Sequence, residues 1–182
     1  MAAETISIGK LLDVSSGKWL TDQYVTVEDQ RIVSISSVAP PRIDLDLSQY
    51  YVLPGLIDLH VHLTSDSNVH GYRRLSRSVS RSAIFGVTAA EKTLNAGFTT
   101  VRNLGAYGFA DVALRDAINA GEVPGPRMRV AGKMICITGG HCDGGLLAHE
   151  FQHQSDGAAN GPWEVKAKVR ENIKFGADVI KF

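Results

Sequence analysis

From Pro54 onward, apolar segments of strand length alternate with amphipathic segments of helix length. We predict strands over 56–63, 98–104, within 127–137 and over 177–181, and helices over 83–96, 109–120 and from Pro162 to about 175. A glycine follows each helix, where a residue in the left-handed conformation commonly ends one. This alternation is typical of parallel strands that are connected by helices packed on the sheet. The pattern therefore predicts an α/β domain over residues 54–182.

Residues 1–53 have a different pattern, in which short alternating apolar runs are separated by turns. Segments 24–27 and 31–35 flank Asp29-Gln30 and are typical of a β-hairpin. The proline pair Pro40-Pro41 then interrupts the pattern. This segment is predicted to form a small β domain.

The charge of the chain gives no support for a polyanionic partner. Lys plus Arg and Asp plus Glu each number 19 in 182 residues, so the net charge is zero. We therefore expect neither nucleic acid nor a membrane as a partner. Residues 1–5 lack the basic and apolar regions of a signal peptide, and a cytoplasmic location is expected. Cys136 and Cys142 are predicted to form neither a disulfide framework nor a CxxC site.

Three chemically active side chains lie at alternate positions of one predicted strand: Asp58, His60 and His62. Side chains of a strand alternate between its faces, so these three are expected to point the same way. Two imidazoles on one face, two residues apart, can bind one metal ion. The spacing alone is also compatible with a pair of half-buried histidines that bind nothing.

The run from Leu53 to His62 resembles the first-barrel-strand signature of the amidohydrolase superfamily. Segments 96–102, 125–132 and 176–181 resemble the second, third and fourth strands of that family, in the same order. The similarity is greatest to the branch that holds prolidase-like enzymes, Xaa-Arg dipeptidases and imidazolonepropionase relatives. It implies the first half of a (β/α)8 TIM-like barrel, with its first four βα units in 54–182, preceded by part of a small β-sandwich domain in 1–53.

The resemblance also implies a metal site and a reaction. It assigns His60 and His62 to one or two divalent ions, most simply Zn²⁺, at the mouth of the barrel. Lys181 would be the carboxylated, catalytic lysine that bridges two metals, and His141 in a Gly-Gly-His loop would contact the substrate. The implied activity is metal-dependent hydrolysis of amide or peptide-like C–N bonds, with dipeptides or N-acyl amino acids as substrates. The further His and Asp ligands of the family would lie outside these 182 residues.

Several alternatives stay open from the sequence. The chain could be a catalytically incomplete fragment or a metal-binding remnant, and it could form a homo-oligomer or pair with a missing C-terminal half. His149-Glu-Phe-Gln-His153 matches H-E-x-x-H, the zinc metalloprotease motif, although a polar loop is favoured because glycines leave room for only a short helix. The stretch with Arg73, Arg74, Arg77 and Arg81 is predicted to be a solvated helix face or loop.

Overall fold

The structure is a computed structural model that describes residues 3–151 and 153–182. The chain divides into two compact units, Met1–Pro54 and Gly55–Phe182. No helix in the described residues is both long and apolar enough to cross a membrane.

The first unit is a four-stranded sheet with the strand order β3-β2-β1-β4. Its strands are β1 (Glu4–Asp13), β2 (Lys18–Glu28), β3 (Arg31–Ser36) and β4 (Leu45–Val52). The hairpin predicted around Asp29-Gln30 is confirmed, since β2 and β3 pair antiparallel on either side of it. Both turn residues have positive φ, as a turn that follows the right-handed twist of its strands requires. Strand β4 instead pairs parallel to β1.

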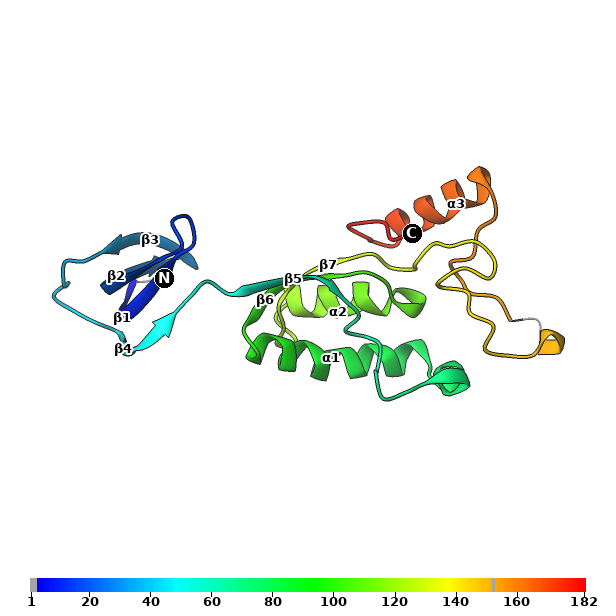
Figure 1. Cartoon of the computed structure of the whole chain (residues 1–182), viewed down its shortest axis with the longest axis horizontal. Helices are drawn as coiled ribbons and strands as arrows, with labels where there is room; N and C mark the ends of the chain where they lie inside the picture. Colours follow the sequence, from blue (N-terminus) through cyan, green and yellow to red (C-terminus); the bar gives the residue numbers. More distant parts are fainter. Residues whose placement is uncertain (1–2, 152) are drawn as a thin grey trace. The chain divides into compact units, whose positions relative to one another are not determined.

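The second unit contains a parallel sheet with the order β5-β6-β7. Its strands are β5 (Leu56–Val61), β6 (Phe98–Asn103) and β7 (Arg127–Val130), all within segments predicted to hold strands (Figure 1). Because consecutive strands are parallel and adjacent, their carboxyl ends lie at one edge of the sheet. The residues that follow each strand therefore converge there.

Helices α1 (Val79–Asn95), α2 (Ala110–Asn119) and α3 (Pro162–Lys174) confirm the three predicted helices (Figure 1). In the described residues, short 3₁₀ helices accompany them at Gly71–Ser76, Tyr107–Phe109 and His149–Phe151. Apolar side chains of α1, α2, β6 and β7 form the core, which includes Ala90, Val101, Leu114 and Val130. This core fixes the strand ends from which the loops of the second unit emerge.

The strand predicted over 177–181 is wrong, because this segment has no strand structure. The backbone N–H groups of Asp178 and Val179 both donate to the carbonyl of Val130, at 2.8 and 3.2 Å. The N–H of Val130 donates instead to the Asp178 carboxylate, at 2.9 Å. The Asp178 side chain thus accepts from the N–H that a neighbouring strand would bond to, and 177–181 does not pair with β7 as a strand. Arg115 from α2 holds the same carboxylate at 2.9 Å.

Candidate active site

His60 lies near the end of β5 and His62 directly follows that strand, and their rings lie close to each other. Their ring centroids are 5.4 Å apart. The backbone N–H of His60 donates to the Asp58 carboxylate at 2.9 Å, which fixes the local backbone. Nδ1 of His62 lies 3.3 Å from the carbonyl oxygen of Gly105, on the loop that follows β6. Because a carbonyl only accepts, this bond requires the proton on Nδ1 and leaves Nε2 with a free lone pair.

The environment of His62 favours the neutral imidazole. Partial burial lowers the pKa of His62, more than its bond to Gly105 raises it, and the charges of His60, Lys181 and His141 lower the pKa further. All four predicted site residues are therefore close enough to interact electrostatically, although they come from three separate parts of the sequence. A neutral imidazole is the form that can coordinate a metal ion.

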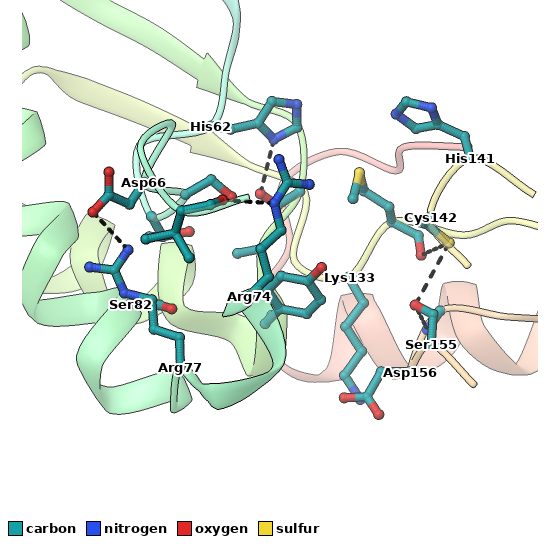
Figure 2. A pocket seen from close by; sticks show the side chains of 18 of the residues that line it. His62, Asp66, Arg74, Arg77, Ser82, Lys133, His141, Cys142, Ser155 and Asp156 are labelled. Atoms are coloured by element: carbon teal, nitrogen blue, oxygen red, sulfur yellow. Dashed lines mark hydrogen bonds and ion pairs between the residues drawn. The ribbon is translucent and has the colours of Figure 1, made fainter. Parts of the chain in front are cut away.

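A cavity of about 490 Å³ adjoins His62. Figure 2 shows His62, Arg74 and the Asp66–Arg77 ion pair on one side of it and Lys133, His141 and Cys142 on the other. A second, smaller cavity of about 90 Å³ is lined by residues that include Met134, Cys136, His141 and Lys181. The carbonyl of Lys181 accepts from the N–H of Ile135 at 2.8 Å, which ties residue 181 to the segment after β7. His141 therefore borders both cavities.

The loop that carries His141 is held by specific bonds. Cys136 and Cys142 form a disulfide across it, a single pairing that the sequence did not predict. The turn at Gly139-Gly140, where the N–H of Gly140 donates to the carbonyl of Ile137, brings the two cysteines together. The buried carboxylate of Asp143 accepts from the N–H groups of Gly139 and Ser155, at 3.0 and 2.6 Å. These donors hold the pKa of Asp143 below its usual value.

Arg73, Arg74 and Arg81 are exposed, as predicted, but Arg77 is not. Arg77 is only 15% exposed, pairs with Asp66 at 3.1 Å and lies over the ring of Phe85. Arg74 lines the large cavity, with its Nε donating to the carbonyl of Val69 at 3.0 Å. The prediction of a solvated face is therefore wrong for Arg77, which packs beside the candidate site.

The two histidines of the H-E-x-x-H motif do not share a helix, as a zinc metalloprotease requires. A 3₁₀ helix covers only His149–Phe151, His153 is outside it, and Gln152 lies outside the described residues. Two histidines four residues apart share a face only when a helix spans both. In the part of the chain that the structure describes, no three His, Cys, Asp or Glu side chains gather as a metal site.

Two buried polar residues that support the site had no distinctive sequence signal. Asn103 and Asp111 are fully buried, and the Asn103 amide donates to the Asp111 carboxylate at 3.1 Å. Burial raises the pKa of Asp111, against the donors that surround it. Asn103 ends β6, and only the expectation that parallel strand ends converge could have drawn attention to it.

Comparison with known proteins places these features in a family. A search of curated proteins found no match. Among solved structures, the chain is similar to a Xaa-Pro dipeptidase with bound methionine in the active site (34% identity, TM-score 0.86). It is also similar to a prolidase complexed with N-methylphosphonate-L-proline (30%, 0.81) and to A. niger ochratoxinase (25%, 0.77).

These three alignments cover 98%, 99% and 98% of this chain, but in each case 46% of the solved structure. The chain thus spans less than half the length of these proteins. Its α/β fold matches the aligned portion of these amidohydrolase structures. Residues 51–182, which include the β5 histidines, the His141 loop and Lys181, match the amidohydrolase family. The chain belongs to the amidohydrolase family.

Proposed function

We propose that this chain carries part of the divalent-metal site of a hydrolase that cleaves amide or peptide-like C–N bonds. The observation that supports this most directly is the pairing of His60 and His62, with ring centroids 5.4 Å apart beside a cavity. The neutral state of His62 and its free Nε2 suit a metal ligand. Zn²⁺ is the simplest ion for such nitrogen donors.

In this proposal His60 and His62 bind the ion, and Lys181 completes the set as a carbamate. The lysine amine must first lose its proton and then add to CO₂, which forms an N–C bond and releases one further proton. In support of this arrangement, the charge of Lys181 lowers the pKa of His62, and the carbonyl of Lys181 is bonded to the segment after β7. A bound divalent ion would polarise the scissile carbonyl and lower the pKa of a coordinated water.

The cavity, of about 490 Å³, has the size of a small-molecule site. His141 lies across it from His62 and is proposed to contact the substrate (Figure 2). Dipeptides or N-acyl amino acids are the proposed substrates, in keeping with the Xaa-Pro dipeptidase and the prolidase among the similar structures. We further propose that the parallel sheet belongs to a (β/α)8 barrel and the four-stranded sheet to a β-sandwich.

Metal binding by the 182-residue chain tests this proposal. The purified chain is freed of metal, and Zn²⁺ is titrated by calorimetry at pH 7.5. We expect at least one ion per chain, with binding lost in the His60→Ala/His62→Ala double variant. The matched control is His149→Ala/His153→Ala, which removes the histidines of the H-E-x-x-H motif and is expected to bind normally. The proposal is wrong if the first variant binds as wild type does, or if only the control loses the ion.

Two further measurements test the proposed carbamate and the proposed hydrolysis. Carbon-13 NMR with labelled bicarbonate is expected to show a carbamate signal that is absent in Lys181→Arg. Release of the free amino acid from a panel of dipeptides and N-acyl amino acids tests the reaction. A chain that binds Zn²⁺ without turnover would support the alternative of a metal-binding piece that is catalytically incomplete.

A further inference from the structure

The backbone on both sides of His62 is fixed by the residues that follow β6. The N–H of Leu104 donates to the carbonyl of Val61 at 3.0 Å, just before His62. Just after it, the N–H of Leu63 donates to Oδ1 of Asn103 at 2.7 Å. The two peptide groups that define the position of His62 therefore both bond to neighbouring residues at the end of β6.

Asn103 also reaches the His62 ring, through one intermediate group. Its Nδ2 donates to the carbonyl of Gly105 at 3.2 Å, and the same oxygen is the partner of His62 Nδ1 at 3.3 Å. Gly105 has φ +132°, and a Cβ at this position would collide with the Met134 side chain. The carbonyl is thus aimed at His62 by a backbone conformation that glycine permits and that the Asn103 amide supports.

Asn103 is itself held rigidly. It is fully buried, and its Nδ2 also donates to Oδ2 of Asp111 at 3.1 Å. The same carboxylate oxygen accepts from the N–H of Gly132 at 3.1 Å, and Oδ1 accepts from the N–H of Val112 at 2.9 Å. The Asn103 amide consequently has one available orientation, with its oxygen toward Leu63 and its nitrogen toward Gly105 and Asp111.

We propose that Asn103, anchored by Asp111, is a positioning residue that fixes His62 with its proton on Nδ1 and its Nε2 free for a metal ion. This inference rests on the proposed metal-binding function of His62. Bonds to the second ring nitrogen set the tautomer and orientation of metal-binding histidines, and removal of such a support weakens metal binding about 10- to 100-fold. We expect a loss in this range when the Asn103 amide is removed.

The test compares Zn²⁺ affinity in three variants of the chain. Asn103→Leu keeps the approximate volume but removes all three side-chain bonds, and is expected to weaken Zn²⁺ binding about 10- to 100-fold. Asn103→Asp/Asp111→Asn keeps an acceptor for the N–H of Leu63 and a side-chain pair with residue 111, but removes the donor to the Gly105 carbonyl and the acceptor for the N–H of Gly132. Because it keeps the bond to Leu63, this double variant is expected to weaken Zn²⁺ binding by a smaller factor than Asn103→Leu does. Circular dichroism and thermal unfolding verify that each variant is folded.

Asn172→Leu provides the matched control. Asn172 is also buried and exchanges two bonds with the backbone of Lys133, at 3.1 and 2.9 Å, but it does not touch His62. We expect a comparable loss of stability and wild-type Zn²⁺ affinity. A general effect of destabilisation on metal binding would instead lower the affinity of all three variants alike and overturn the proposal.

Nitrogen-15 NMR of the histidine rings tests the same inference without metal. In the wild-type chain at pH 7.5, His62 is expected to show a protonated Nδ1 and an unprotonated Nε2, whereas Asn103→Leu is expected to show a tautomer mixture. The opposite tautomer in the wild type, or unchanged ring signals and Zn²⁺ affinity in a folded Asn103 variant, would overturn it. If the wild type binds no Zn²⁺, the proposed function fails while the ring signals still test the positioning role.

Discussion

Reduction of the Cys136–Cys142 disulfide is expected to destabilise the second unit measurably. The crosslink joins residues six positions apart, and loop-closure entropy for a separation of this size amounts to about 2 kcal/mol. For a unit of roughly 130 residues, that free energy corresponds to a decrease in Tm of about 8 °C. The loss arises mainly because the reduced, unfolded chain regains conformational freedom between the two cysteines.

The assay is thermal unfolding of the oxidised chain with and without a phosphine reductant, followed by circular dichroism. Thiol titration establishes that oxidised samples hold no free thiol and that reduced samples hold two. The Cys136→Ser/Cys142→Ser variant is the control, and its Tm should equal that of the reduced wild type and should not respond to reductant. Equal Tm values for the oxidised and reduced wild type, with the thiol counts as stated, would refute the reasoning.

Three further predictions use contacts elsewhere in the second unit. Gly157→Ala should lower the free energy of unfolding by about 1–3 kcal/mol, because the added Cβ would collide with the backbone carbonyl of Met134. Gly144→Ala, whose Cβ would meet open space, should leave the free energy of unfolding nearly unchanged in denaturant titration. Arg115→Ala removes a guanidinium that is 14% exposed from its ion pair with Asp178 and should lower the free energy of unfolding by about 2 kcal/mol. Arg129→Ala, at the same carboxylate but 72% exposed, should cost less than about 0.5 kcal/mol, and equal losses would contradict this account. Burial lowers the pKa of His62, so protonation of this residue destabilises the folded state. The free energy of unfolding should therefore be at its full value above pH of about 6.5 and should decrease as pH falls through the lowered pKa. A His62→Asn variant should show a smaller decrease in the free energy of unfolding over this pH range.

Local patterns predicted the elements of the second unit because their signals are contained within each segment. All three helices end near glycines with positive φ, at Gly97, Gly121 and Gly176. The three apolar segments that became parallel strands also stand out by composition. The segment 177–181 had a similar composition but is not a strand, because a ladder depends on partners elsewhere in the chain. Here the Asp178 carboxylate takes the N–H of Val130 that a neighbouring strand would have used.

The residues of the candidate site also differ in whether a local pattern predicts them. The histidines of β5 were identifiable from their alternation and from the surrounding motif, and the structure places His60, Lys181 and His141 near His62. The disulfide beside His141 was not predicted, because two cysteines six residues apart pair only if the turn between them brings them together. Arg77 was assigned to solvent because its partners, Asp66 and Phe85, lie on either side of it in the sequence and no local pattern links them.

Asn103 shows why the support of a site is harder to predict than its chemistry. A histidine is noticed because few side chains can bind a metal, whereas a buried asparagine is compatible with many structural roles. Its importance here follows from where β6 ends relative to β5, since parallel pairing brings Asn103 beside Val61. That register places one amide between the backbone of Leu63 and the carbonyl that holds the His62 ring. The orientation of the histidine is therefore a property of the paired strands, and substitutions that shift the register between β5 and β6 should disturb metal binding even when both histidines are retained.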